Sequence, residues 1–406
     1  MSWKVKKLEE VCTFTRGLTY KKSDEAPDGD IEVLRANNIE LDSGLLNFDE
    51  IKRLRSSFEV PPDKLIKMNS LIICTASGSK SHLGKAAFVD KDYKAAFGGF
   101  LGMLTPSDEL IGRYLFHLMQ SKVYKDFIAS ISDGANINNL RFNQLAHFDV
   151  PIPTIEEQKR IVAILDAAFE QIDQAKAIAQ QNLQNAREIF DSALKQAFNL
   201  DGKNWQVKNL GDVCDITGGG TPSKSNPEFY NGDIPWATVR DMRVSYLTDT
   251  DFKISLEGLK RSSSNLIPAG NVIIATRVGL GKVCVLGQDT AINQDLRAIV
   301  PKDAKSISRG FLFWWLNSIS NIIEAEGTGA TVKGVKLPFI KKLAFPCACI
   351  EEQKRIAEKL GALADNVKEL ESIYQQKITA LDELKQSLLQ QAFSGQLTAK
   401  HSDATV

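Results

Sequence analysis

The 406-residue chain lacks a long apolar run. No stretch reaches the roughly 18 apolar residues that a membrane-spanning helix needs. The first seven residues contain neither an apolar core nor a small-residue cleavage site, so they do not resemble a signal peptide. Both observations predict a cytoplasmic protein without a membrane segment.

Metal-ligating and redox-active residues are also scarce. The chain has four histidines and six cysteines, and the histidines follow no metal-binding spacing. Only Cys347 and Cys349 lie close together, and two thiols are too few for a zinc site. We therefore expect free, buried thiols in a reducing compartment and a packed core histidine at His117, which lies in an apolar helical segment. No metal ion or cofactor is expected to bind this chain.

Net charge is absent as well, because 50 basic residues balance 50 acidic ones. This balance argues against a small, strongly basic DNA-binding protein. Residues 201–346 are mildly basic, with 18 basic and 14 acidic side chains, whereas residues 151–200 hold 5 and 7. A role on DNA would therefore depend on local patches, or on partners that contact the phosphates.

Motifs of nucleic-acid enzymes are incomplete. Residues 226–229 (NPEF) resemble the amino-methyltransferase motif NPPF, but the second proline is missing and no glycine-rich cofactor loop follows a nearby strand. Residues 279–282 (GLGK) lack the spacing and the Ser or Thr of a phosphate-binding P-loop. Residues 92–94 (DYK) have no acidic partner for a nuclease site. All three segments are expected to be turns, and the chain is not expected to be an enzyme.

The chain contains an internal repeat. Residues 3–8 (WKVKKL) return as 205–210 (WQVKNL), and residues 155–161 (IEEQKRI) return unchanged as 350–356. The repeat predicts a first globular domain at 1–155, a helix at 156–200, a second domain at 201–350, a second helix at 351–395 and a tail at 396–406.

Each copy ends in a predicted long helix. Residues 156–198 contain neither Pro nor Gly, and small or apolar residues recur at alternating steps of four and three, as along a coiled-coil seam. Alanine dominates the first seam and leucine the second, which suits close packing of the two helices on each other. The alternative is two unrelated amphipathic helices that each cover their own domain. The seam positions are Ile161, Leu165, Ala168, Ile172, Ala175, Ala179, Ala186, Ile189 and Ala193, then Ile356, Leu360, Leu363, Val367, Leu370, Tyr374, Leu381, Leu384 and Leu388.

The globular parts are predicted to be α+β. Strand candidates are bounded by Gly, Pro, Asn or Asp. They comprise residues 31–35, 71–75, 86–89, 234–239, 271–276 and 283–286, and the short helices comprise 111–129 and 308–323.

Polar loops recur at matched places in both copies. Arg, Lys, Asn and Gln read base edges in DNA, whereas Ser, Thr and Lys suit phosphates. Glycines 218–220 let the following loop approach a ligand closely. The alternative is a set of ordinary solvated loops. The candidate DNA-binding residues are Lys21, Lys22, Arg35, Asn37, Lys80, Lys85 and the asparagines of 136–139 in the first copy, and Thr221, Ser223, Lys224, Arg240, Arg277, Lys282, Asn293 and Gln294 in the second.

These motifs together resemble the DNA specificity subunits of type I restriction-modification systems. Residues 155–161, after VPIP at 150–153, resemble the entry to their spacer helix. GGTP at 219–222 and GDIPW at 232–236 resemble the opening of their target-recognition domain, and QAFSGQL at 391–397 is typical of their closing segment. The first domain departs from this pattern, because it lacks GGTP and has Glu32 in place of the proline.

The resemblance implies two pseudo-symmetric target-recognition domains, in inverted orientation, on two spacer helices that form an antiparallel coiled coil. Each domain would read one part of a bipartite double-stranded DNA target. The subunit itself would do no chemistry: two methyltransferase subunits would dock on it and hold S-adenosylmethionine for adenine methylation, and restriction subunits can join. The candidate spacer and docking residues are Glu157, Gln158, Arg160, Ile161, Leu165, Glu352, Gln353, Arg355, Ile356 and Leu360.

Two other functions stay open at this point. A coiled-coil scaffold with two protein-binding domains would not select one DNA sequence in the presence of the methyltransferase. A self-contained methyltransferase or nuclease would act as the purified chain alone.

Overall fold

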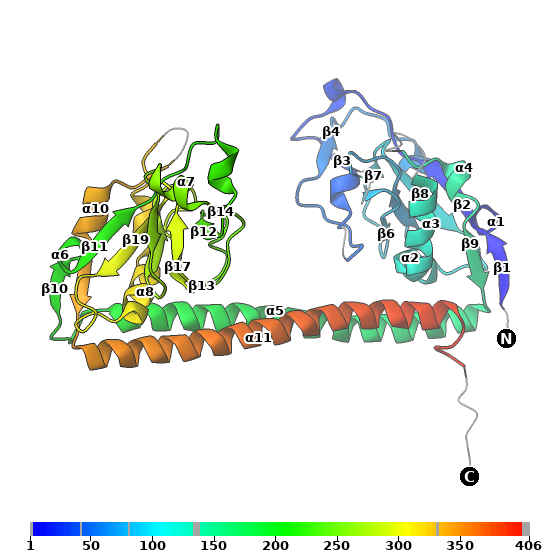
Figure 1. Ribbon diagram of the computed structural model, residues 1–406. Helices are drawn as coiled ribbons and strands as arrows, with labels where there is room; N and C mark the ends of the chain where they lie inside the picture. The colour runs from blue at the N-terminus through cyan, green and yellow to red at the C-terminus, as the bar shows by residue number, and fades with distance from the viewer. Residues whose placement is uncertain (1–2, 41–42, 80–81, 133–138, 330–332, 400–406) are drawn as a thin grey trace, which may run out of the picture. The chain divides into compact units, whose positions relative to one another are not determined.

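The computed structural model describes residues 3–40, 43–79, 82–132, 139–329 and 333–399. The chain forms two compact units: unit 1 comprises Met1–Ala179 and Gln375–Val406, and unit 2 comprises Gln180–Tyr374. Both units mix helices and sheets, as the α+β prediction requires (Figure 1). Each unit also contains part of both long helices, so the compact units divide these helices near their middles.

Unit 1 contains three sheets. They have the strand orders β2-β8-β5-β6, β4-β3-β7 and β1-β9. The elements of unit 1 before the first long helix are β1 (Lys4–Lys7), α1 (Leu8–Val11), β2 (Cys12–Arg16), η1 (Lys22–Asp24), β3 (Ile31–Leu34), η2 (Ala36–Asn38), β4 (Lys52–Leu54), η3 (Pro62–Lys64), β5 (Leu71–Cys74), β6 (Ala86–Phe88), β7 (Ala96–Phe97), β8 (Leu101–Pro106), α2 (Gly112–Gln120), α3 (Lys122–Ser132), α4 (Phe142–Leu145) and β9 (Asp149–Ile152).

Unit 2 repeats this strand order and adds one edge strand to each of its two larger sheets. Its sheets have the orders β11-β19-β16-β17-β13, β14-β12-β18-β15 and β10-β20. The elements between its parts of the long helices are β10 (Gln206–Asn209), α6 (Leu210–Val213), β11 (Cys214–Gly218), η5 (Pro227–Tyr230), β12 (Ile234–Ala237), β13 (Tyr246–Leu247), β14 (Lys253–Ile254), α7 (Leu256–Lys260), β15 (Asn265–Ile267), β16 (Val272–Ala275), β17 (Val283–Leu286), β18 (Thr290–Ile292), β19 (Leu296–Pro301), α8 (Arg309–Ser318), α9 (Ser320–Ala325), α10 (Leu337–Lys342) and β20 (Ala344–Cys347).

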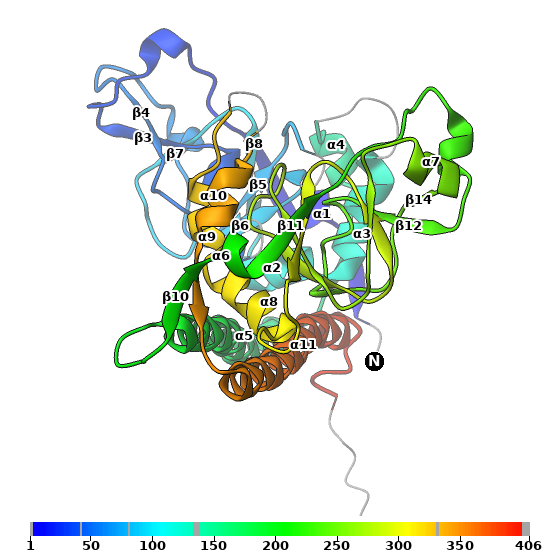
Figure 2. The ribbon, with the colours of Figure 1, turned by 60° about the vertical axis from the view of Figure 1, so that its left-hand side comes forward.

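The central strands come from the continuous apolar runs of the sequence. Every residue of β5 and of β16 is buried, as expected for strands covered on both faces. In unit 2, α8 packs on β16 and β17 and lies on the side of the sheet that faces the long helices (Figure 2). The predicted helix 111–129 is two helices instead, because the chain turns at Ser121, whose hydroxyl donates to the carbonyl of Leu118 at 2.6 Å. The predicted helix 308–323 is likewise divided into α8 and α9.

The two long helices are α5 (Ile155–Phe198) and α11 (Ile350–Phe393). In unit 1 they run antiparallel, because Asp173 pairs with Lys385 and Lys176 pairs with Asp382 one turn further along α5. In unit 2, Arg187 of α5 pairs with Glu371 of α11. The predicted pairing of the helices is confirmed.

The predicted seam is correct in part. Ile161, Leu165 and Leu360 are buried, but Ile189, Leu370 and Leu384 are exposed by 60%, 40% and 47%. The buried positions near the helix ends are Leu194 in α5 and Leu389 and Ala392 in α11. An undistorted helix drifts by about 20° per heptad from a strict seven-residue repeat, so the packed face moves off the predicted seam. Near its end α5 also packs on its own unit, since Phe190 meets Trp314 with ring centroids 5.6 Å apart.

A buried glutamine joins each long helix to its own globular part. In unit 1, Gln158 accepts from the N–H of Ile111 at 2.8 Å and donates to the carbonyl oxygens of Glu109 at 2.8 Å and Pro153 at 3.1 Å. Gln158 and its counterpart Gln353 were predicted as spacer-helix and partner-docking residues, and they lie in the first turn of α5 and of α11. They cannot dock a partner, because their side chains are fully used inside their own unit.

Gln353 makes the same three bonds in unit 2. It accepts from the N–H of Ser308 at 2.9 Å and donates to the carbonyl oxygens of Ser306 at 3.0 Å and Ala348 at 2.8 Å.

The other predicted spacer and docking residues are either committed to their own unit or exposed. Burial removes Ile161, Leu165 and Leu360 from any partner surface. Glu157 accepts from the Thr398 hydroxyl, and Glu352 accepts from the Trp205 indole at 2.9 Å, so both acids serve their own unit. Ile356 is half-buried in the core of unit 2. Arg160 and Arg355 are exposed and stay candidates.

The remaining expectations concern cysteines and His117. All six thiols are free, and Cys12, Cys74, Cys214 and Cys284 are buried, but Cys347 is half-buried and Cys349 exposed, contrary to the expectation. His117 is a packed core histidine, as predicted, and its Nε2 lies 2.7 Å from Oδ1 of Asp166.

Candidate nucleic-acid interface

The strands of unit 2 bring four loops to one place. β11, β12, β16 and β18 all end where β19 begins, since Gly218 pairs with Arg297, Ala275 with Leu296, and Ala237 with Ile292. The loops that follow these four strands form what we call the strand-end surface of unit 2. All eight predicted residues of the second copy lie on these loops, and Lys282 is the last residue of the loop between β16 and β17.

Asp295 organises the centre of the strand-end surface of unit 2. Its carboxylate accepts from the side-chain amides of Asn293 and Gln294, each at 3.1 Å, and lies 3.8 Å from the guanidinium of Arg277. The Thr221 hydroxyl donates to the Gln294 side chain. Four predicted residues from three loops are therefore brought together, around an acid that the sequence did not single out.

Gly219, two residues before Thr221, makes this arrangement possible. A Cβ on Gly219 would lie 2.1 Å from the carbonyl oxygen of Ile292 and 2.3 Å from that of Asn293. Only glycine lets the two loops pass so closely. The same loop is fixed by Trp236 of β12, whose indole donates to the carbonyl of Gly220 at 3.1 Å.

Arg240 and Lys282 lie on adjacent loops. Arg240 is exposed on a turn held by Asp241, whose carboxylate accepts from the N–H and hydroxyl of Thr238 at 2.7 and 2.9 Å. The side chain of Val239 lies 3.0 Å from the Cβ position of Gly279, so the turn touches the loop that ends in the exposed Lys282.

Ser223 and Lys224 lie further out and are exposed. Their turn is held by the Tyr230 hydroxyl, which donates to the carbonyl of Pro222 at 2.6 Å.

Unit 1 has a matching strand-end surface. β2, β3, β5 and β7 end where β8 begins, since Arg16 pairs with Gly102, Cys74 with Leu101, and Leu34 with Phe97. A Cβ on Gly17 would lie 2.0 Å from the carbonyl oxygen of Gly98, the counterpart of the contact at Gly219.

The predicted residues of unit 1 are less concentrated. Lys21, Lys22 and Asn37 are exposed. Arg35 is half-buried, and its guanidinium donates to the carbonyl of Glu50 at 3.2 Å. A groove of about 770 Å³ contains Lys22 and Arg35, but its cations Lys52 and Arg53 are already paired, with Glu25 and Glu32.

Lys85 does not belong to this surface. Its ammonium is turned inward and donates to the carbonyl of Ile39 at 2.7 Å, and burial lowers the pKa of this lysine below its usual value. It therefore stabilises the fold instead of contacting a ligand. Lys80 and residues 136–138 lie outside the described residues.

The sequence missed a small polar pocket in unit 1. It has a volume of about 180 Å³ and is lined by Arg16 and Arg141 together with Thr75, Asn139 and the exposed Phe100. Of these, only Asn139 was predicted. Arg16 could have been noticed because it directly precedes Gly17, the first-copy match of Gly219.

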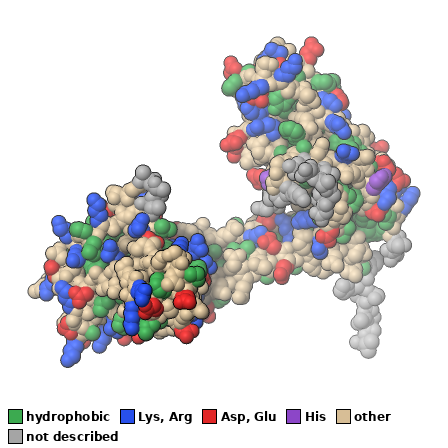
Figure 3. Space-filling view, turned by 45° about the horizontal axis from the view of Figure 1, so that its top comes forward, with side chains coloured by type: hydrophobic (Ala, Val, Ile, Leu, Met, Phe, Trp, Pro, Cys, Tyr) green, Lys and Arg blue, Asp and Glu red, His purple; other side chains and the backbone are tan. Residues whose placement is uncertain are grey.

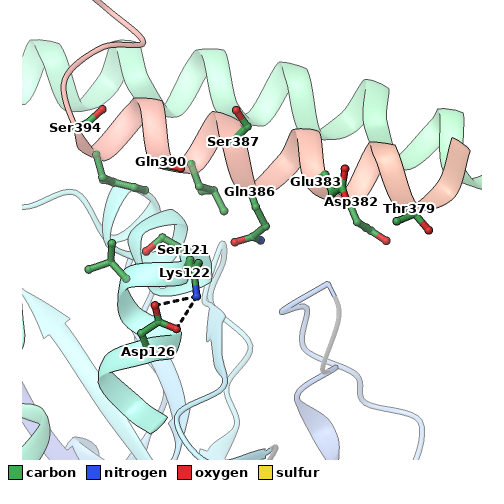
Figure 4. A pocket seen from close by; sticks show the side chains of 13 residues that line it. Ser121, Lys122, Asp126, Thr379, Asp382, Glu383, Gln386, Ser387, Gln390 and Ser394 are labelled. Atoms are coloured by element: carbon green, nitrogen blue, oxygen red, sulfur yellow. Dashed lines mark hydrogen bonds and ion pairs between the residues drawn. The ribbon is translucent and has the colours of Figure 1, made fainter. Parts of the chain in front are cut away.

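A larger cavity of unit 1 has a different character. It has a volume of about 830 Å³ and lies between the α2–α3 turn and the last turns of α11 (Figure 4). Its single cation, Lys122, is paired with Asp126 at 3.0 Å, and Glu383 adds negative charge next to Asp382, which pairs with Lys176. This lining does not suit a nucleic acid.

The charges on the surface of each unit are mixed. Lys and Arg side chains alternate with Asp and Glu on the visible faces, and no continuous basic patch is seen there (Figure 3). The distribution agrees with the zero net charge of the chain.

The segment that resembled a methyltransferase motif is structural. Residues 226–229 begin the η5 turn, where Asn226 accepts from the N–H of Glu228 and Phe229 is buried. Within the part of the chain that the structure describes, no group of three or more His, Cys, Asp or Glu could hold a metal ion. None of the described helices is long and apolar enough to cross a membrane.

The fold and these surfaces define a class: a recognition protein with two copies of one loop-bearing domain. The sequence profile of the type I restriction modification DNA specificity domain matches residues 1–182 and 202–380, and the chain belongs to this family. It is a DNA specificity subunit, which does no chemistry of its own.

Similar proteins cover nearly the whole chain. The StySPI specificity subunit of Salmonella potsdam is 27% identical over 98% of this chain and 90% of its own length. The EcoKI specificity subunit of Escherichia coli (strain K12) is 25% identical, with the same coverage.

Solved structures share the fold. A chain of a type I R-M system aligns with a TM-score of 0.81 at 22% identity, covering 98% of both chains. The HsdS subunit of Thermoanaerobacter tengcongensis aligns with a TM-score of 0.63 at 21% identity, covering 98% of this chain and 97% of its own.

Proposed function

We propose that this chain recognises a bipartite double-stranded DNA target, one part through each strand-end surface. The observation that carries this proposal is the repetition of the surface itself. The same strands end at the same place in both units, and each time a glycine lets two loops pass closely, at Gly17 and at Gly219. Two copies with different loop residues suit a target made of two different parts.

The proposal includes partners that supply the chemistry. Two methyltransferase subunits would dock on the exposed faces of α5 and α11, where Arg160 and Arg355 lie, and would bind S-adenosylmethionine for adenine methylation. Restriction subunits would add DNA cleavage, and the complex would act in the cytoplasm. Because the surfaces of this chain carry mixed charge, the partners would also provide part of the phosphate contacts.

The decisive experiment maps methylated adenines in DNA from cells that carry the complete system. A bipartite sequence with a constant gap is expected, and it should disappear when this chain is deleted. Methylation without a sequence preference would instead support a scaffold. Methyl transfer by the purified chain alone would contradict the absence of catalysis.

Single substitutions then test the surface of unit 2. Arg240→Ala and Arg277→Ala should relax one half of the target, at a cost of about 1–3 kcal/mol if the arginine reads a base. Lys224→Ala should weaken binding to all sequences alike. Full activity of all three variants would mean that unit 2 contacts DNA elsewhere.

A further inference from the structure

Both units have an arginine at the same place in the sheet, but different strands supply it. In unit 1, Arg16 of β2 pairs with Gly102 of β8, whereas in unit 2 Gly218 of β11 pairs with Arg297 of β19. Directly opposed residues of antiparallel strands point to the same face of a sheet. Each unit therefore has one arginine and one glycine at the same place, with the two strands exchanged.

The surroundings of each glycine fit this exchange. The Cβ position of Gly218 lies 3.0 Å from Nη1 of Arg297, so the glycine leaves room for the guanidinium from the opposite strand. In unit 1 the space above Gly102 is filled by the Phe142 ring, whose edge lies 2.6 Å from the Cβ position. The guanidinium of Arg16 lies over that ring, 5.7 Å from its centroid.

A second cation follows the same pattern. Arg141 lines the 180 Å³ pocket together with Arg16, and it precedes α4 directly. The preceding residue, Leu140, donates its N–H to the carbonyl of Thr75 at 2.6 Å.

Unit 2 repeats this backbone contact. Val335 donates its N–H to the carbonyl of Thr276 at 2.9 Å, so the next residue, Lys336, takes the place of Arg141 directly before α10. Both units therefore have a cation at this place, although one is arginine and the other lysine.

Within the described ranges, these four cations have no carboxylate partner. Among the described residues none of them forms an ion pair, whereas Arg53, Arg55 and Arg113 each pair with a carboxylate. The Nε of Arg297 is buried and has no hydrogen-bond partner. A small polar pocket with two unpaired cations favours an anion.

The residues next to these cations indicate which kind of anion would bind. Ala76 and Phe100 of unit 1 stand where unit 2 has Arg277 and Asp295, so the adjoining loops differ in the features that could read bases. The paired positive charge is the same in both units. A feature shared by two domains that read different sequences suits the part of DNA that is the same in every sequence.

We propose that Arg16 with Arg141, and Arg297 with Lys336, form two matched sites, each for one phosphate of the DNA backbone. This inference rests on the function proposed above. The two sites would position each domain on the duplex, and the loops around them would read the bases.

The test measures DNA binding by the complex of the full chain with its methyltransferase. The probes are a duplex with the mapped target and a duplex of scrambled sequence, titrated between about 50 and 200 mM salt. The double variant Arg16→Ala/Arg141→Ala should lower the slope of log affinity against log salt by about one, equally for both duplexes. The methylated sequence should not change.

Unit 2 allows a rescue experiment. Arg297→Ala should lower the slope in the same way, and adding Gly218→Arg should restore it, because the guanidinium then comes from the strand that supplies it in unit 1. Lys305→Ala is the matched control: this exposed lysine lies beyond the opposite end of the β11–β19 pair, and its loss should leave the slope unchanged. Thermal unfolding verifies that each variant is folded.

Several outcomes would overturn the inference. An unchanged slope in the folded Arg16→Ala/Arg141→Ala variant would show that no phosphate binds there, and a changed methylation sequence would make these arginines base readers. Failure of the wild-type complex to select any sequence would refute the proposed function instead.

Discussion

At the scale of single residues, two buried glutamines attach the long helices to the globular parts of their units. Gln158 and Gln353 are 0% and 1% exposed, and each satisfies one backbone N–H and two carbonyl oxygens. A buried group that loses its partner costs about 1–3 kcal/mol.

Removing one of these glutamines should therefore destabilise its unit. Gln353→Ala is expected to lower the free energy of unfolding by about 1–3 kcal/mol or more, since three main-chain partners lose their bond. Chemical denaturation measures the change. Gln171→Ala, at an exposed position of α5, is the control and should stay within about 0.5 kcal/mol of the wild type. Equal stability of the two variants would contradict this role for Gln353.

His117 makes the stability of unit 1 depend on pH. Burial lowers the pKa of His117 below its usual value of 6.5, against the opposing effect of Asp166, and Arg113 and Lys385 lower it further. The pKa of Asp166 is also lowered: burial would raise it, but its bonds to His117 and Arg113 outweigh that effect. The unfolded chain thus binds more protons than the folded chain as the solution is acidified, so stability is lost as the pH falls.

The histidine sets the upper part of this pH window. Its contribution is complete well above pH 6.5, and it falls as the pH drops through 6.5 toward the lower folded-state pKa. Melting temperatures from pH 8 to 5 should decline less in His117→Gln, which keeps a donor for Asp166 but does not titrate. His147→Ala, at an exposed histidine, should decline like the wild type. Identical curves for His117→Gln and the wild type would refute the assignment.

At the scale of elements, each strand-end surface forms because two of its loops pass close to each other at a glycine. A methyl group on Gly219 would meet main-chain oxygen, which cannot rotate away as a side chain can.

Gly219→Ala should displace the Thr221 loop and weaken DNA binding by the complex, while most of the fold persists. Gly361→Ala is the matched control, because no atom lies within 4 Å of its Cβ position on α11. It should raise stability by up to about 1 kcal/mol and leave binding unchanged. Binding by Gly219→Ala at the wild-type level would show that the loops tolerate a wider separation.

The strands also show how much of the fold could be predicted from the sequence. Continuous apolar runs predicted β5, β16 and β17 to within a residue, because buried central strands need such runs. The two-residue strands β7, β13 and β14 were not predicted, since two residues have no periodicity.

The candidate site could also be predicted only in part. Matched loops indicated Thr221 and Arg277, and an Asn-Gln pair indicated Asn293. The structure brings all three residues together around Asp295. Arg16 and Arg297 were missed because they correspond only through cross-strand pairing, and alignment of the two copies places each against a glycine. The inward turn of Lys85 depends on the distant Ile39 carbonyl, which no local pattern reveals.

At the scale of the whole molecule, each globular part begins and ends on adjacent strands. β1 pairs with β9 and β10 pairs with β20, both antiparallel, so the entry and exit of each part lie side by side. Such a part can be replaced without changing the path of the helices that follow it.

Replacing residues 201–346 with the equivalent segment of a relative should therefore change only one half of the DNA target. The segment contains all of β10 and all but the last residue of β20. Methylation mapping of the chimaera provides the measurement, and reinsertion of the native segment is the control. A chimaera that is folded and active, but altered in both halves, would contradict independent reading by the two units.

The glutamine contacts have a consequence for how such a protein can evolve. Gln353 holds the main chain at Ser306, Ser308 and Ala348, and no side chain takes part. Mutations that alter those side chains leave the attachment intact. Side chains of the globular part can thus diverge, while the joint that holds this part to the helix needs no compensating change.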